Sequence, residues 1–157
     1  GERCTSRFWQ RRRRRPVGRI TIKMPTEFMD QLAKAAQKTD TAIPKALEAG
    51  GKVVFETMKA NLRSAIGRDT KYPSRSTGKL LAALGVSPVK LNDEGNYDVK
   101  VGFSEDREVS NAKLANILEY GKHGQPPKPI LKPTRRSSRR SCIEAMQAAL
   151  KEELGLK

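Results

Sequence analysis

The sequence predicts an α+β fold in which long N-terminal helices and a C-terminal helix pack on a small antiparallel β-sheet. Two stretches, one in the first half of the chain and one at its end, repeat their apolar residues with helical spacing. Between them a short segment alternates apolar and polar residues, as a half-buried strand does. We expect a single domain over residues 19–157, because a chain of 157 residues suffices for one modest core.

The first eighteen residues differ from the rest in composition. Residues 1–18 hold seven Arg and one Glu and show no periodic pattern. We interpret them as a basic tail outside the domain, derived from a tag or from translation that began upstream of the native start. The alternative is a basic arm that binds nucleic acid, with Phe8 and Trp9 stacking on bases.

A strand and then a helix are predicted at the start of the domain. Residues 19–24 alternate apolar and polar side chains, which predicts a short strand that Pro25 ends. Thr26 is a good N-cap, and residues 27–38 carry apolar side chains on one helical face. These residues therefore predict the first helix.

The second predicted helix, over about residues 43–66, has the clearest periodicity in the chain. Residues 39–41 offer its N-cap, and Pro44 is expected near its first turn, where a missing N–H costs little. Its apolar stripe consists of Leu47, Gly51, Val54, Met58, Leu62 and Ala65. Gly50 and Gly51 cost helix stability of about 1 kcal/mol each. They either let another backbone approach closely or mark a kink.

The middle of the chain predicts a loop and a β-hairpin. Residues 67–79 are polar and contain Gly and Pro, which indicates a long loop. Residues 86–91 predict one strand, at a sheet edge because Pro88 has no backbone N–H. After a turn at residues 92–96, Tyr97–Phe103 alternates strictly and is expected to pair with that strand.

One helix is predicted on each side of a proline-rich connector. Asn111–Tyr120 predicts a short helix, and residues 134–154 predict the last one. Residues 122–133 contain four prolines and predict a stiff, extended segment that can reach a neighbouring subunit.

Sequence motifs for catalysis or metal binding are not found. The segment STGKL at 76–80 looks like the end of a phosphate-binding loop, but Pro73 and Leu80 stand where that loop needs Gly and Ser or Thr. His123 has no Cys or carboxylate at ligand spacing and no residue to orient it. The two cysteines fit no metal or redox spacing. We therefore expect no catalytic residue, no metal and no cofactor, and an enzyme or toxin is the third of three hypotheses.

The formal net charge of +15 is concentrated in two segments. Residues 1–18 carry +6 and residues 122–140 carry +7, which leaves only +2 elsewhere. Such segments suit a polyanionic partner, or else they are a solvated surface. No apolar run approaches the roughly 18 residues of a membrane span, so no membrane partner is expected. The residues expected to contact the DNA backbone or an acidic partner are Lys128, Lys132, Arg135, Arg136, Arg139 and Arg140.

Arg135, Arg136, Arg139 and Arg140 lie in the first turns of the last predicted helix, where the helix dipole is already positive. A nearby anion would relieve this arrangement, and solvent screening is the alternative.

The order of these segments resembles a family of small tailed-phage morphogenesis proteins, known as tail-component, neck or tail-completion proteins. STGKLLAALGV at 76–86 is followed by a hairpin ending in VKVGF at 99–103, and then by AKLANILEYGKHGQPPKPILKPTRR at 112–136. The matching residues are Thr77, Gly78, Leu80, Val101, Gly102, Ala115, Glu119, Tyr120, Gly121, Pro129, Leu131 and Pro133. Ala82, Ala83, Lys122 and Ile130 depart from the family pattern.

The resemblance, over about residues 26–154, implies a structural virion protein and not an enzyme. It implies a subunit of a homo-oligomeric ring of six- or twelve-fold symmetry at the head–tail junction, assembled in the cytoplasm of the bacterial host. Its partners would be itself, other neck and tail proteins, and packaged DNA through non-specific contact. Self-association is expected through Gly50 and Gly51 or the hairpin edge. The assembly interface is expected at Leu118, Glu119, Tyr120, Gly121, Pro126, Pro127, Pro129, Ile130, Leu131 and Pro133.

The alternative function is a stand-alone basic protein that contacts the phosphate backbone of nucleic acid non-specifically.

Overall fold

The structure, a computed structural model, describes residues 18–26, 29, 39–67, 78–104 and 110–155. In chain order its elements are β1 (Arg19–Lys23), α2 (Thr39–Ala65), α3 (Lys79–Ala82), β2 (Leu84–Val86), β3 (Lys90–Leu91), β4 (Tyr97–Phe103), α4 (Asn111–Tyr120) and α5 (Leu131–Leu154). The predicted α+β class is confirmed. Most of the predicted basic tail, the predicted helix at 27–38 and most of the predicted loop at 67–79 lie outside the described residues.

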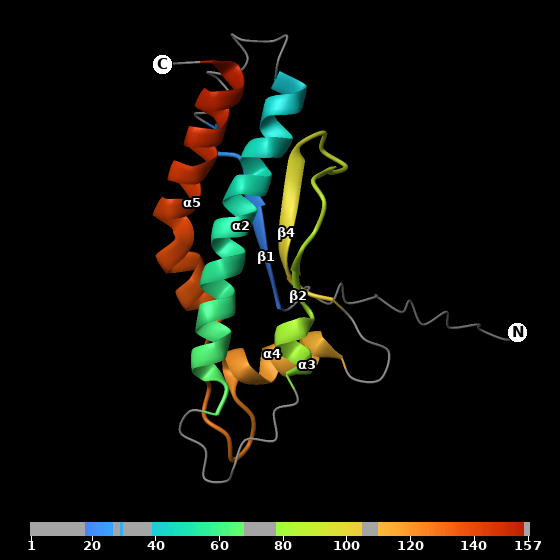
Figure 1. Ribbon diagram of the computed structural model, residues 1–157. Coiled ribbons are helices and arrows are strands. Elements are labelled where there is room, and N and C mark those ends of the chain that lie inside the picture. Colours follow the sequence, from blue (N-terminus) through green and yellow to red (C-terminus); the bar gives the residue numbers. More distant parts are fainter. Residues whose placement is uncertain (1–17, 27–28, 30–38, 68–77, 105–109, 156–157) are drawn as a thin grey trace, which may run out of the picture.

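The strands form one antiparallel sheet with β4 at its centre. β1 pairs with one side of β4, while β2 and β3 follow each other along the other side. Figure 1 shows α2 along one face of the sheet and α5 beside α2. α5 packs along α2 and also contacts β1. None of the helices in the described ranges has the length and apolar character that a membrane span requires.

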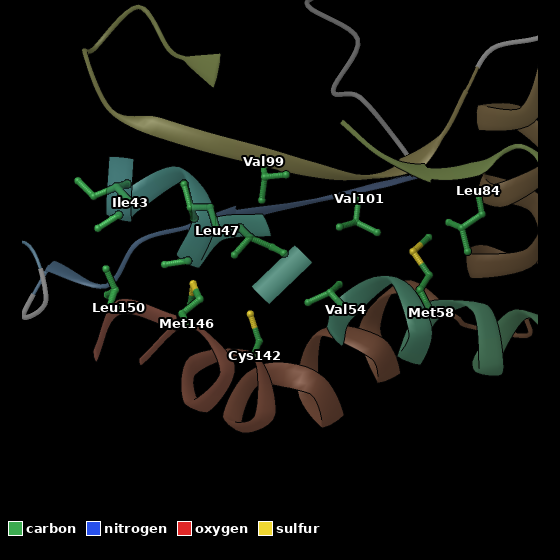
Figure 2. Close-up of a cluster of buried hydrophobic side chains, with 13 residues drawn as sticks. Ile43, Leu47, Val54, Met58, Leu84, Val99, Val101, Cys142, Met146 and Leu150 are labelled. Atoms are coloured by element: carbon green, nitrogen blue, oxygen red, sulfur yellow. The ribbon is translucent and has the colours of Figure 1, made fainter. Parts of the chain in front are cut away.

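The main core lies between the sheet and α2 and continues between α2 and α5. Figure 2 shows Val99 and Val101 of β4 facing Leu47 and Val54 of α2, with the side chains of Cys142, Met146 and Leu150 of α5 entering the same cluster from the side away from β4. Every residue of the predicted stripe on α2 is buried: Leu47, Gly51, Val54, Met58, Leu62 and Ala65. The helical periodicity of the sequence therefore identified the buried side of α2 correctly.

The start of α2 was predicted wrongly. The helix begins at Thr39 rather than near residue 43, so residues 39–41 are helical, and Pro44 lies beyond the first turn. Pro44 has no N–H to donate to the carbonyl one turn earlier, which weakens the helix locally. Ile43 and Ala46 on either side of it are buried in the core. Tertiary packing therefore extends the helix through a position that local signals mark as its start.

Gly50 and Gly51 allow α2 to pack closely on two sides. A Cβ at Gly50 would lie 2.7 Å from Cγ of Met146 on α5, and a Cβ at Gly51 would lie 3.2 Å from Cγ1 of Val86 on β2. The atoms that approach are side-chain atoms, so the glycines make room for packed side chains and not, as one interpretation held, for another backbone. Both glycines are buried within the chain, so they do not form the self-association surface that we expected.

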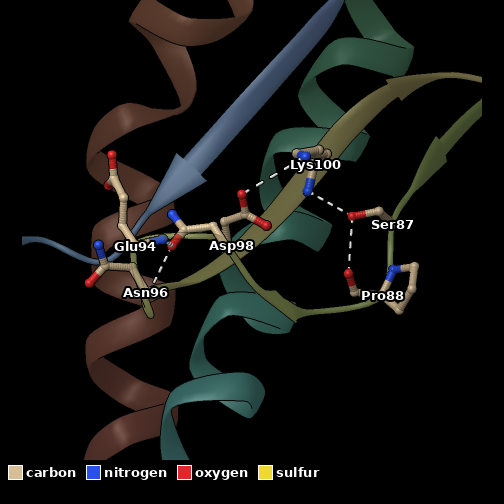
Figure 3. Close-up of polar contacts among 7 residues, drawn as sticks. Ser87, Pro88, Glu94, Asn96, Asp98 and Lys100 are labelled. Atoms are coloured by element: carbon tan, nitrogen blue, oxygen red, sulfur yellow. Dashed lines mark hydrogen bonds and ion pairs between the residues drawn. The ribbon is translucent and has the colours of Figure 1, made fainter.

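The single strand predicted over residues 86–91 is interrupted. β2 ends at Val86 and β3 begins at Lys90, because Pro88 cannot donate to the sheet ladder. Ser87 bridges the gap: its N–H donates to the carbonyl of Lys100 at 2.7 Å, and its Oγ accepts from the N–H of Lys100 at 2.9 Å. Figure 3 shows the second of these bonds reaching from the edge to β4.

Candidate assembly surface

The helix α4 has the predicted bounds and is anchored at its start. The Ser110 side chain caps it by accepting from the N–H of Lys113, and Asn111 Nδ2 donates to the carbonyl of Ser104 at 2.5 Å. Ala115 is fully buried, and Leu118 packs against a small cluster that contains Leu62 and Ile130. These contacts fix α4 against the end of the sheet and of α2.

Glu119, near the end of α4, caps the start of α5. Its Oε2 accepts from the N–H groups of Ile130 at 2.7 Å and Leu131 at 2.8 Å, and its Oε1 accepts from the N–H of Lys132 at 3.1 Å. The first amides of a helix have no acceptor within the helix. A carboxylate there satisfies them and also stabilises the positive end of the helix dipole. Glu119 is only 6% exposed, so its carboxylate is buried and bonded to groups of the same chain.

Two predictions about the last helix are corrected by this cap. α5 begins at Leu131 rather than at residue 134, so the connector is shorter than the predicted 122–133. Pro133 lies in the first turn of α5, where its missing N–H needs no acceptor. Glu119 also provides an anion at the arginine-rich start of α5, whereas the sequence led us to expect that anion from phosphate or a neighbouring subunit.

The segment between α4 and α5, residues 121–130, is called the α4–α5 loop. Lys122 and Gln125 exchange backbone hydrogen bonds of 3.0 and 2.8 Å, and Lys128 N–H donates to the carbonyl of Leu118 at 2.7 Å. Gly121 has φ +79°, and a Cβ there would lie 2.8 Å from the Gln125 carbonyl oxygen. The prediction of an extended connector was therefore wrong, because the loop turns sharply and returns to the end of α4 (Figure 1).

The predicted interface residues fall into three groups. Glu119 and Ile130 are buried, so they support the surface from within. Leu118, Gly121 and Leu131 are half-buried. The exposed residues are Tyr120, Pro126, Pro127, Pro129 and Pro133. Tyr120 is 70% exposed, more than any other large hydrophobic residue in the described part of the chain.

The predicted basic residues occupy the solvent side of α5. Arg135, Arg136, Arg139 and Arg140 are all exposed and are called the arginine face. Lys132 is also exposed, whereas Lys128 in the loop is half-buried. Arg140 Nε pairs with Glu144 at 2.9 Å, an exposed pair that contributes little to stability. The arginine face is thus accessible to a partner.

Polar contacts that the sequence did not indicate hold the start of α5 on α2. Thr134, which is fully buried, donates from Oγ1 to the carbonyl of Ile130 at 2.6 Å and accepts from Asn61 Nδ2 at 2.8 Å. Ser138 Oγ donates to the carbonyl of Thr134 at 2.7 Å. The only signal for this arrangement was the four-residue spacing of the small residues Thr134, Ser138 and Cys142, which face α2.

Side chains that could bind a metal or act in catalysis are dispersed in the parts of the chain that the structure describes. No three or more of their His, Cys, Asp and Glu side chains are grouped to hold a metal ion. His123 is exposed in the tight turn of the α4–α5 loop. Cys142 is buried, and burial raises the pKa of its thiol, so this cysteine serves packing rather than nucleophilic chemistry.

Comparison with known proteins gives one match. Residues 26–121 match the family model described as Bacteriophage HK97-gp10, putative tail-component. No curated protein and no solved structure matches the chain. The matched region includes the whole sheet after β1, together with α2 to α4 and Gly121. Because the match covers more than half of the sequence, the chain belongs to the HK97-gp10-like family of bacteriophage tail components.

Proposed function

We propose that this protein is a ring-forming subunit at the head–tail junction of a tailed phage, where it acts in neck or tail completion. Family membership makes it a phage tail component, which works in contact with other phage proteins. The observation that carries the finer proposal is the exposed end of the molecule formed by Tyr120 and the α4–α5 loop.

This end is preorganised for binding. Backbone hydrogen bonds within the loop and to Leu118 fix its shape before any partner arrives, which reduces the entropy lost on association. Tyr is enriched at protein interfaces because its ring buries a large area with few rotatable bonds. Exposed prolines beside Tyr120 add further rigid surface.

The arginine face extends this surface along α5. Guanidinium groups bind carboxylates through two parallel hydrogen bonds, and Arg is enriched at protein interfaces. We assign the arginine face to acidic side chains of a neighbouring subunit or of another neck or tail protein. An interface that joins two different patches of the same chain generates a ring when the rotation closes. The six- or twelve-fold symmetry of that ring rests on the family resemblance.

The experiment is to measure the mass of the purified protein by light scattering and to image it by negative-stain electron microscopy. Both are done alone and after mixing with portal-side and tail-side proteins of the same phage. We expect a closed ring in at least one of these conditions. Tyr120→Ser should weaken assembly, whereas Leu114→Ser, which removes an exposed hydrophobic side chain from the first half of α4, should leave it unchanged. A protein that stays monomeric in every mixture contradicts the proposal.

A further inference from the structure

The side of the sheet that faces away from α2 is called the outer sheet face. Side chains alternate between the two sides of a strand, so residues between the core positions of β1 and β4 share this face. The strand registers arrange them in rows: Arg19, Gly102 and Gly85; Thr21 and Lys100; Lys23, Asp98 and Lys90. None of the eight has an apolar side chain.

The outer sheet face is strongly positive. Arg19, Lys23, Lys90 and Lys100 are all exposed, whereas Asp98, the single acid, is only 9% exposed. Asp98 Oδ2 lies 4.0 Å from Lys100 Nζ, as Figure 3 shows, and the registers place Asp98 between Lys23 and Lys90. This carboxylate reduces repulsion among the lysines, and the face keeps an excess of positive charge.

The chemistry of this face differs from that of the arginine face. Cores of protein–protein interfaces are enriched in aromatic residues and Arg and depleted in Lys. The outer sheet face has three lysines, one arginine and no aromatic side chain, so it lacks the groups that a protein partner would desolvate. Lysine binds phosphate as a point charge, and contacts to phosphates position a protein on DNA without reading its sequence.

The dimensions of the face also suit a nucleic-acid backbone. Lys23 and Lys90 lie on the two strands that flank β4, so their backbones are about 10 Å apart. Arg19 and Lys23 are four residues apart on β1, or about 14 Å. One strand of B-DNA carries about four phosphates over that length. Among the described residues, a Cβ at Gly85 would have no neighbour within 4 Å, whereas a Cβ at the adjacent Gly102 would lie 2.8 Å from Cβ of Arg19.

We propose that the outer sheet face contacts the phosphate backbone of duplex DNA, without sequence preference, through Arg19, Lys23, Lys90 and Lys100. The arginine face, which belongs to α5 and not to the sheet, serves protein partners instead. This inference rests on the proposed function for the source of the DNA, which is the path of packaged DNA through the head–tail junction.

The test measures binding of the full chain to a short duplex of mixed sequence, by fluorescence anisotropy at increasing NaCl concentration. Lys23→Gln, Lys90→Gln and Lys100→Gln are combined in one variant. The matched control, Arg135→Gln with Arg136→Gln and Arg139→Gln, removes the same charge from α5. Each lost phosphate contact should reduce the slope of log K against log salt by about 1. We expect a reduction of about 2 to 3 for the sheet variant and below about 1 for the helix variant.

Residues 1–18 are present in both variants, so their contribution cancels in the comparison. An equal reduction in both variants, a reduction in the helix variant alone, or no DNA binding by the wild-type chain overturns the proposal. A sheet variant that keeps its DNA slope but loses an acidic neck or tail protein in a binding assay would assign the face to protein, which also overturns it.

A second variant keeps the test decisive if the triple variant does not fold, as judged by circular dichroism. Thr21→Lys adds a cation to the middle row, where Thr21 is exposed opposite Lys100, and should steepen the slope by about 1. An unchanged slope contradicts the proposal. Ring assembly is measured separately. If no ring forms but the slope of log K against log salt changes in the variants as expected, the proposed function is overturned and this inference is not.

Discussion

Glu119 Oε2 accepts a hydrogen bond of 2.7 Å from the backbone N–H of Ile130, and this bond joins the end of α4 to the start of α5. Both residues are buried. The same carboxylate also accepts from the next two amides. It therefore replaces the local Ser, Thr, Asp or Asn that usually caps a helix, and it couples two helices that are separated by a loop.

Replacing Glu119 should destabilise the fold. Glu119→Ala leaves the N–H of Ile130 buried without its acceptor, so we expect the free energy of unfolding to fall by about 2–3 kcal/mol. Glu119→Gln keeps an acceptor oxygen but loses the charge, and should cost about 1 kcal/mol. Urea denaturation followed by circular dichroism measures both. Glu144→Ala, at an exposed carboxylate on α5, is the control, and an equally small effect of Glu119→Ala would contradict the capping role.

Two glycines of the α4–α5 loop provide a matched pair for backbone strain. Gly121 and Gly124 have φ +79° and +77°, which side chains rarely adopt. A Cβ at Gly121 would also lie 2.8 Å from the Gln125 carbonyl oxygen, whereas a Cβ at Gly124 meets nothing within 4 Å. Gly124→Ala should therefore lower the free energy of unfolding by about 1 kcal/mol, and Gly121→Ala by at least about 1 kcal/mol more. Equal losses in thermal or urea denaturation would show that the loop tolerates the clash.

The paired glycines of α2 should also respond differently to alanine. Gly50→Ala brings a methyl group within 2.7 Å of buried Met146, and overpacking of about 1–3 kcal/mol outweighs the gain of about 1 kcal/mol in helix propensity. A Cβ at Gly51 lies 3.2 Å from Cγ1 of Val86 and 3.7 Å from the methyl groups of Val99, and the second distance is an ordinary van der Waals contact. Val86 is 38% exposed at the sheet edge and has room to shift. We expect Gly51→Ala to be neutral or to stabilise by up to about 1 kcal/mol, as measured by chemical denaturation. Equal destabilisation by both variants would contradict this difference.

Burial raises the pKa of the Cys142 thiol above its ordinary value of 9.0. The folded chain therefore holds this proton to a higher pH than the unfolded chain does. Below the unfolded pKa both states are protonated and the contribution to stability is complete. As the pH rises through and beyond about 9, the unfolded thiol ionises first, so the free energy of unfolding should fall.

Alkaline urea denaturation measures this fall, and a Cys142→Ala variant should show a smaller one. In a Cys4→Ser background, the native thiol should react slowly with a thiol reagent at pH 8 and rapidly once the chain is unfolded. Rapid reaction in the native state would contradict the packing role of Cys142.

The sequence predicted the elements whose patterns are local. The stripe on α2, the alternation of β4 and the bounds of α4 all follow from periodicity over a single element. The break between β2 and β3 was missed because Ser87 and Lys100, which bridge it, lie thirteen residues apart on neighbouring strands. Strand pairing of this kind carries no local signal beyond Pro88 itself.

The candidate surface was only partly predictable for a similar physical reason. Tyr120 and the prolines were identified as exposed candidates from composition and resemblance. The shape of the loop was not predicted, because it depends on Gly121, on the bond from Lys128 to Leu118 and on a capping carboxylate eleven residues before the amide of Ile130. Proline content alone indicated an extended segment, but these tertiary hydrogen bonds fold the loop back.

The Glu119 cap also has a mechanical consequence. The carboxylate and the Leu118 carbonyl bind the C-terminal part of the α4–α5 loop, at Ile130 and Lys128, to the end of α4, so tension between α4 and α5 bypasses the rest of the loop. A force that pulls on α5 is resisted by the packing of α5 along α2. This packing is the most extensive contact between helices in the described part of the structure. In the assembly that we propose, a subunit built in this way would transmit load through its helices and keep the exposed loop undistorted.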